Sequence, residues 1–335
     1  MQVLQAQFLS SEQVAAPSAV IRVNSLTKRF KRTIAVDKAT LEVQKGDVFG
    51  LLGPNGAGKT TIIRMLLGLI KPTDGNAEVF GLNTFQQRVE VSKRVSAIVE
   101  SPALYPDLTG RDNLRAMALV AGLSHPEKKI DEVLEKMGLA ARAKERFSRY
   151  SLGMKQRLCI ASALLTDPDI IILDEPTNGL DPAGMAEIRQ LIKELAAQGR
   201  TVFLSSHLLF EVQQVCNRVA IIQRGQIIGQ GLVEELLSAN SAIYIRVSQE
   251  EWEKAWYTLQ AAGYAGQLRA EGYHLLVTAP ATESATINRV LATAGVYASE
   301  IMSRSQTLEE YYLNLTSSNQ LPAVNISGGN NIGNQ

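Results

Sequence analysis

The chain has almost no charge imbalance, and this absence limits its possible partners. Its 34 basic and 33 acidic residues give a formal net charge of +1 over 335 residues. Because no global positive field draws such a chain to nucleic acid, any contact with DNA, RNA or a membrane surface must be local. The sequence also lacks a run of about 18 apolar residues, which a membrane-spanning helix requires, so we expect no span.

Cysteine is scarce as well, and only Cys159 and Cys216 occur. The two are too far apart for a CxxC motif, which argues against a redox or zinc site. Both lie in stretches typical of a core helix or sheet, which predicts buried free thiols in a reducing compartment. The hydrophobic content of 45% and the charged content of 20% are those of a globular protein, here with one large domain and one small one.

The most informative stretch is an apolar strand, Val48 to Leu52, followed by a glycine-rich loop with the spacing G-x-x-x-x-G-K-[ST]. In such a loop the backbone N–H groups surround phosphates, Lys59 reaches the outer phosphates and the Thr60 hydroxyl binds Mg²⁺. A helix from Lys59 to about Ile70 directs its N-terminal partial positive charge at the same anion. The nucleotide-binding residues predicted here are Gly53, Pro54, Asn55, Gly56, Ala57, Gly58, Lys59, Thr60 and Thr61.

Two acids follow a second apolar run. Four consecutive apolar residues, Ile170 to Leu173, predict a strand buried on both faces, as in a parallel sheet. Asp174, at its carboxyl end, is placed to hold Mg²⁺, and Glu175 is placed to orient or deprotonate the attacking water. Hydrolysis of a phosphoanhydride needs mainly positioning and charge neutralisation, so this pair of acids suits that reaction.

Two further strands also end in polar residues. The strand predicted at Val95 to Val99 leads to Glu100, a carboxylate that either contacts metal or water near the phosphates or is a solvated loop charge. The strand predicted at Thr201 to Leu204 leads to His207. A lone histidine is more often structural than catalytic, but its place at a strand end in line with Asp174 favours contact with the γ-phosphate.

Phe30 and Ser151 each allow two interpretations. Phe30 lies between two strand-like segments within Val20 to Gln44, where an exposed ring either stacks on a purine base or packs at a sheet edge. Ser151 is able to cap a helix that runs to about Leu165. The start of that helix is an ordinary N-cap or a second anion site.

The remaining elements are predicted from apolar spacing. Before the accessory region we expect helices at 86–94, 111–121, 126–137, 140–146 and 183–197, a strand at 76–80, and a hairpin of strands 219–223 and 227–230. From Ser241 we expect a small α+β appendage, with strands at 243–247, 273–278 and 297–303 and helices at 249–262, 283–294 and 308–315.

In this order the motifs resemble those of the ATP-binding subunit of an ABC transporter over about Val20 to Leu237. Gly53 to Thr61 resembles Walker A, Ser151 to Arg157 the signature motif, Ile170 to Glu175 Walker B, Asn178 to Asp181 the D-loop, His207 the switch histidine and Phe30 the adenine-stacking aromatic. The resemblance implies an α/β P-loop NTPase with a parallel core, a small antiparallel β subdomain and a helical insert, followed here by the α+β appendage.

The resemblance also implies ATP and Mg²⁺ as cofactors, and a homodimer or heterodimer of ATPase subunits with a separate ABC-2-like permease. Each ATP is then held between one chain's phosphate loop and the other chain's signature helix, at the cytoplasmic side of the cell membrane. The implied catalytic residues are Lys59, Glu175 and His207, and the implied metal-binding residues are Thr60, Asp174 and Glu100. The nucleotide-binding set gains Phe30, Glu100, Ser151, Gly153 and Asp181.

Three departures from the usual motifs narrow the resemblance. Glu100 stands where most relatives have Gln, and Leu152 and Met154 replace the usual Gly and Gln of the signature. These features resemble the bacitracin and lantibiotic self-protection exporters, which implies export of an antimicrobial peptide, a drug or another amphiphile. The alternative is a soluble ABC-type ATPase acting on nucleic acid or ribosomes. A single motif set and a short, nearly neutral insert favour the transporter, with no nucleic acid partner.

Four segments are predicted. Residues 1–18 lack a basic n-region and a continuous apolar h-region, so we expect a flexible leader and not a signal peptide. Residues 19–238 form the ATPase domain, with a helical subdomain at about 86–158. Residues 239–316 form the accessory α+β domain. Residues 317–335 are rich in Asn, Gly and Ser, which predicts a disordered tail.

Overall fold

The computed structural model describes residues 19–99, 104–238, 241–272, 274–304 and 306–318. These residues divide into two compact units. Unit 1 comprises the described residues within Met1–Phe49, Gly56–Ser205 and Arg224–Gln226, and unit 2 comprises those within Gly50–Asn55, Ser206–Gln223 and Ile227–Gln335. The predicted leader, Glu100 and residues 319–335 of the predicted tail lie outside the described residues. The tail was expected to begin at residue 317, but residues 317 and 318 belong to the last helix, α11 (Leu308–Ser318). The predicted domain boundaries stay predictions.

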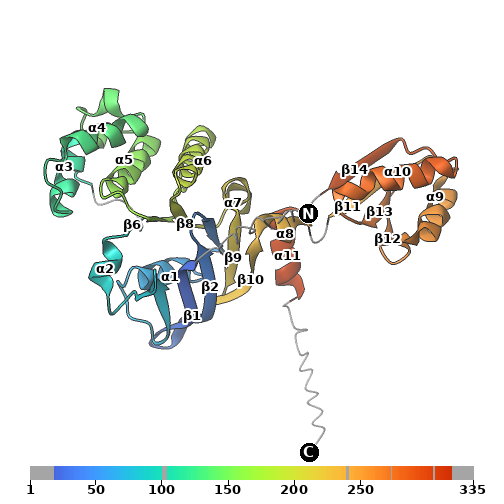
Figure 1. Ribbon diagram of the computed structural model, residues 1–335, viewed down its shortest axis with the longest axis horizontal. Helices are drawn as coiled ribbons and strands as arrows, with labels where there is room; N and C mark the ends of the chain where they lie inside the picture. The colour runs from blue at the N-terminus through green and yellow to red at the C-terminus, as the bar shows by residue number, and fades with distance from the viewer. Residues whose placement is uncertain (1–18, 100–103, 239–240, 273, 305, 319–335) are drawn as a thin grey trace, which may run out of the picture. The chain divides into compact units, whose positions relative to one another are not determined.

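The strands of the described residues form three sheets, with the orders β2-β1-β4-β5, β10-β9-β3-β8-β7-β6 and β12-β13-β11-β14 (Figure 1). The expected mixture of a parallel core with smaller antiparallel sheets is confirmed. The strands are β1 (Ala19–Phe30), β2 (Thr33–Gln44), β3 (Val48–Leu52), β4 (Asp74–Val79), β5 (Leu82–Asn83), β6 (Val95–Ile98), β7 (Ile170–Asp174), β8 (Thr201–Ser206), β9 (Arg218–Gln223), β10 (Gln226–Leu232), β11 (Ala242–Arg246), β12 (Leu268–Glu271), β13 (His274–Thr278) and β14 (Glu300–Arg304).

The α-helices of unit 1 include the group α3, α4 and α5, which pack on one another (Figure 1). None of the helices in the described ranges combines the length and the apolar character needed to cross a membrane. The helices are α1 (Lys59–Leu66), α2 (Arg88–Ser92), α3 (Gly110–Val120), α4 (Glu127–Lys136), α5 (Leu152–Leu164), α6 (Pro182–Ala197), α7 (Leu209–Val215), α8 (Val233–Ser238), α9 (Trp252–Leu259), α10 (Ser284–Thr293) and α11 (Leu308–Ser318).

The parallel strands β6, β7 and β8 bring the predicted acids to one edge of a sheet. All five residues of β7 are buried, which explains why its sequence is a continuous apolar run and not an alternating one. In the register of β7 with β8, Asp174 lies opposite Ser205. The carboxyl end of β7 therefore carries its acid beside a hydroxyl of the next strand.

The first helix ends earlier than the apolar pattern predicted. It stops at Leu66 and not near Ile70, because Gly68 follows with a φ of 64°. The Gly68 N–H donates to the Met65 carbonyl at 3.0 Å, and the Leu69 N–H donates to the Arg64 carbonyl at 2.8 Å, which satisfies the last turn. A Cβ at Gly68 would lie 2.2 Å from the Thr84 carbonyl oxygen, so the turn needs glycine.

One other prediction was wrong, and one strand was not predicted. The helix expected at 140–146 is a 3₁₀ turn, Ala140–Arg142, followed by irregular chain. The strand β12 was not predicted, because Leu268 is its one buried residue and four residues show no alternation. The conformation of both segments depends on the residues packed against them, because elements this short contain too few residues for a periodic apolar pattern.

The two cysteines are free and buried, as predicted. Burial raises the pKa of the Cys159 thiol to about 12, and burial raises the pKa of Cys216 as well. The Cys159 thiol also donates to the Lys155 carbonyl at 2.8 Å. Thiolate is therefore scarce at neutral pH, and neither residue is placed for redox chemistry.

Candidate nucleotide-hydrolysis site

The glycine-rich loop has the backbone that its sequence demands. Gly56 and Gly58 have φ angles of 79° and 112°, in the left-handed region that favours glycine. Before them, the Gly53 N–H donates to the Ser206 carbonyl at 3.2 Å, which fixes the start of the loop. Gly58 is the N-cap of α1 and supplies no side chain to its first turn. No side chain therefore caps the start of α1, which is the part of a helix that binds anions.

Lys59 and Glu175 form an ion pair in the site. Lys59 Nζ lies 3.0 Å from Glu175 Oε1, and the two side chains are 6% and 20% exposed. Lys59 is the first residue of α1, and Glu175 is the first residue after β7. The cation predicted to bind phosphates and the carboxylate predicted to activate water thus meet directly.

Thr60 and Asp174 also meet. Thr60 Oγ1 donates to Asp174 Oδ2 at 2.9 Å, and Asp174 is 8% exposed. A hydroxyl and a carboxylate oxygen are hard donors of the kind that Mg²⁺ prefers, and it usually binds through one or two such groups together with phosphates and water. The residues at this point fit the predicted metal ion.

Ser205 is a part of the site that sequence reasoning missed. Its Oγ donates to Asp174 Oδ1 at 2.5 Å and accepts the Glu175 N–H at 3.0 Å. The Glu175 N–H also donates to the Ser205 carbonyl at 3.2 Å, while Glu175 itself has a φ of 51°. That conformation is uncommon for a residue with a side chain and needs fixed neighbours. The available signal was a hydroxyl residue at the end of the strand after β7.

Phe30 and His207 each lie at the end of a strand. Phe30 ends β1, pairs with Thr33 in β2, and is 47% exposed. Lys28 Nζ is 5.0 Å from its ring centroid, so one cation already contacts the ring. His207 is half-buried and directly follows β8. The ring of Phe30 is accessible for stacking, and the position of His207 at a strand end is the predicted one.

The three residues expected to reach a second subunit's nucleotide lie at helix starts. As predicted, Ser151 caps α5, where its Oγ accepts the Met154 N–H at 3.3 Å and the side chain remains exposed. Gly153 has open space on the side where a Cβ would lie. Asp181 Oδ1 accepts the Gly184 N–H at 3.0 Å and caps α6. Their contact with nucleotide stays a prediction.

Comparison with known proteins agrees with this geometry. The ABC transporter family profile matches residues 36–178. The bacitracin transport ATP-binding protein BcrA of Bacillus licheniformis is 40% identical over 301 residues, which cover 89% of this chain and 97% of that protein. A solved ATP-binding subunit of an ABC transporter is 29% identical with a TM-score of 0.59, over 65% of this chain and 91% of that one.

A second solved structure is a dimeric ATP-binding cassette in a post-hydrolysis state with ADP and Pi. It is 26% identical with a TM-score of 0.58, over 64% of this chain and 98% of that one. The chain belongs to the ATP-binding proteins of ABC transporters, and it is a P-loop ATPase that binds ATP. Within that family it falls in the bacitracin-type group. ATPase subunits of this family operate with separate transmembrane permease components and are typically dimeric.

Proposed function

We propose that the chain powers export of an antimicrobial peptide, a drug or another amphiphile through a separate ABC-2-like permease, at the cytoplasmic side of the cell membrane. The observation that carries the proposal is the convergence of the phosphate-loop residues Lys59 and Thr60 with the acids Asp174 and Glu175. The likeness to a bacitracin transport protein supports export. Glu100, Leu152 and Met154, which differ from the usual residues of the family motifs, support membership of the bacitracin-type group.

In this proposal Thr60 and Asp174 hold Mg²⁺, with Glu100 as a third contact. The ion, when bound, neutralises charge on the phosphates. Lys59 binds the outer phosphates of ATP, and these oxygens compete with Glu175 for the ammonium group. Release from Lys59 frees the Glu175 carboxylate to take a proton from the attacking water, and His207 contacts the γ-phosphate.

The second half of each site comes from a second ATPase subunit. Ser151, Gly153 and Asp181 then approach the nucleotide bound by the partner's phosphate loop. The exposed Ser151 hydroxyl and the start of α5 add positive potential at the γ-phosphate. Closure of this dimer on ATP is the step that we expect to move the permease.

Affinity purification of the full chain from membranes tests the proposal. We expect an integral membrane protein with several spans to co-purify. We also expect the ATPase rate of the purified complex to rise when an exported amphiphile is added. Co-purification with RNA or ribosomal proteins in place of a membrane protein would contradict the proposal and favour the soluble alternative.

Ser205→Ala is expected to lower kcat. The change removes the hydroxyl that donates to Asp174 Oδ1, while the Glu175 N–H keeps the Ser205 carbonyl as an acceptor. An unpaired buried polar group costs about 1–3 kcal/mol, or about tenfold to a hundredfold in rate. Steady-state ATPase assays measure the effect. Ser206→Ala is the matched control, because the Ser206 hydroxyl accepts the Leu208 N–H at 3.0 Å and touches neither acid. Equal kcat values for the two variants would refute the role of Ser205.

Phe30→Ala is expected to raise KM for ATP by about tenfold at an unchanged kcat, since base stacking on an aromatic ring is worth about 1–3 kcal/mol. Phe30→Tyr keeps a stacking surface and is expected to retain KM. Phe85→Ala is the control, because Phe85 is similarly exposed at 42% and also lies under a cation, Lys71 Nζ, 5.8 Å from its ring. A KM that does not move in Phe30→Ala would show that the ring only packs.

A further inference from the structure

The C-terminal sheet of β11 to β14 has one covered face and one open face; we call it the accessory sheet. It is antiparallel in the pairings of β11 with β13 and β14 and of β12 with β13, and its strand–helix order is β-α-β-β-α-β. One face forms a core with α9 and α10, whose centre includes Ile245, Leu275 and Leu291. Because side chains alternate along a strand, the neighbouring residues Tyr244 and Leu276 lie on the other face.

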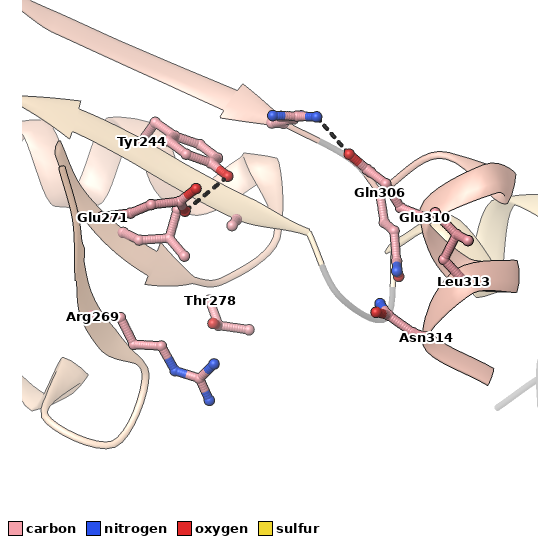
Figure 2. A pocket seen from close by; sticks show the side chains of 11 residues that line it. Tyr244, Arg269, Glu271, Thr278, Gln306, Glu310, Leu313 and Asn314 are labelled. Atoms are coloured by element: carbon pink, nitrogen blue, oxygen red, sulfur yellow. Dashed lines mark hydrogen bonds and ion pairs between the residues drawn. The ribbon is translucent and has the colours of Figure 1, made fainter. Parts of the chain in front are cut away.

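A cavity of about 770 Å³ lies between this open face and α11 (Figure 2). Its volume is within the range of about 300–1,000 Å³ that is typical of small-molecule sites. Figure 2 shows Tyr244, Glu271 and Arg269 on the side of the sheet, and Leu313 and Asn314 on the side of α11. All the lining residues belong to unit 2.

Three of the four charged residues that line the cavity have partners. Glu271 Oε2 accepts the Tyr244 hydroxyl at 3.4 Å, and Arg304 pairs with Glu310 at 2.5 Å. The Thr307 N–H bonds to Glu310, and this bond together with nearby Arg304 holds the pKa of Glu310 below its ordinary value. The Arg269 side chain makes no hydrogen bond or ion pair with the residues that the structure describes, while its backbone is part of the pairing of β12 with β13. The partner of Glu271 is a neutral hydroxyl, so Glu271 and Arg269 each lack an oppositely charged partner among the described residues, and Arg269 is the cation that the cavity offers to an anionic ligand.

The same cavity has an apolar component. Leu276 is half-buried on the open face, and Leu313 of α11 is 54% exposed although it is apolar. The Tyr244 ring adds an aromatic surface on the sheet side. A cationic group at one end of the cavity and apolar surface beside it select an amphipathic anion.

We propose that this cavity binds a small amphipathic carboxylate, with its carboxylate at Arg269 and its apolar body against Tyr244, Leu276 and Leu313. The guanidinium of Arg269 is suited to bidentate binding of a carboxylate. The site is separate from the residues that bind ATP. It does not depend on the proposed export function.

The helix α11 connects this site to the ATPase machinery. On its other side α11 packs against α7 and α8, and the buried Leu308 donates its N–H to Gln213 Oε1 of α7 at 3.0 Å. A Cβ at Gly229 of β10 would lie 2.8 Å from the Leu315 side chain, so α11 also approaches this strand closely. The helix α7 begins two residues after His207. A ligand that contacts α11 is therefore expected to act, through α7, on the segment that carries this histidine.

Calorimetric titration of the full chain with octanoate, without nucleotide, tests the site. We expect octanoate to bind with a Kd below about 1 mM, and Arg269→Gln to weaken it by about tenfold or more, as the loss of a charge-assisted hydrogen bond predicts. Arg289→Gln is the matched control, because this exposed arginine lies on α10, the helix that covers the opposite face. Equal binding by the wild type and Arg269→Gln, or no binding of octanoate, would overturn the proposal.

Two further ligands separate the contribution of the carboxylate to binding from that of the apolar body. Acetate carries the anion alone and octan-1-ol carries the apolar body alone, so both are expected to bind at least about tenfold more weakly than octanoate. Acetate binding as tightly as octanoate would overturn the assignment of an amphipathic ligand.

The ATPase rate tests the connection through α11. We expect octanoate to change kcat by about twofold or more in the wild type and in Arg289→Gln, and to have no effect in Arg269→Gln. An unchanged rate while octanoate binds would overturn the connection to α7 and leave the binding site supported. Because binding is measured without ATP, it stays informative even if the chain powers no exporter.

Discussion

Glu175→Gln is expected to lower the ATPase rate by at least about a hundredfold while ATP still binds, because the amide has nearly the same shape but cannot accept the proton of the attacking water. The variant should therefore accumulate as an ATP-bound dimer. Steady-state hydrolysis, nucleotide-binding titration and size-exclusion chromatography with ATP measure the three properties. Unimpaired hydrolysis by this variant would contradict the assignment of Glu175.

The same substitution has a second signature. Lys59 is almost fully buried, and its charge loses an anionic partner when Glu175 becomes neutral. We expect the nucleotide-free variant to melt at a lower temperature than the wild type, and ATP to raise its Tm by more than it raises that of the wild type. Glu234→Gln is the control, because Glu234 is an exposed acid in α8. A variant with wild-type thermal behaviour would show that the ion pair contributes little.

Ser151→Asp is expected to abolish the ATP-dependent dimer and hydrolysis without destabilising the fold. Asp and Ser are about equally good N-caps, so α5 keeps the bond to the Met154 N–H. A carboxylate facing the partner's γ-phosphate, however, repels it. The dimer is measured in the Glu175→Gln background, where hydrolysis cannot disassemble it.

Ser151→Asn separates charge from size, because Asn has the shape of Asp and also caps a helix well. It is expected to retain much of the dimer that Ser151→Asp loses, with the same Tm in both variants. If Ser151→Asp still dimerises with ATP, Ser151 is an ordinary cap and does not meet a second subunit's nucleotide.

The parts of the site that sequence predicted are those set by local pattern. The run Ile170 to Leu173 identified a strand buried on both faces, and the spacing of Gly53, Gly58 and Lys59 identified a phosphate loop. These signals are strong because burial restricts residue type along the strand, and a positive φ restricts it at Gly58. The family resemblance, the fold class and the ATPase activity that they predicted are confirmed.

Other features depend on contacts between distant residues. Nothing local to Ser205 indicates that it bonds to Asp174, 31 positions away in the chain, because the bond exists only in the register of two neighbouring strands. The left-handed conformation of Glu175 also could not be predicted from the sequence, because a glutamate rarely adopts a positive φ and nothing in its neighbours indicates one. Strand β12 shows the same limit, because its neighbour β13 and not its own four residues supports it.

The return of the last described helix to α7 affects how a shortened chain must be built. Removing everything after residue 238 deletes the accessory sheet and also removes α11 from α7. The surface of α7 that the buried Leu308 contacts is then exposed to solvent. Loss of hydrolysis in such a fragment would report a damaged catalytic unit. A chain in which residues 241–304 are replaced by a flexible linker keeps α11, and only that deletion isolates what the sheet contributes.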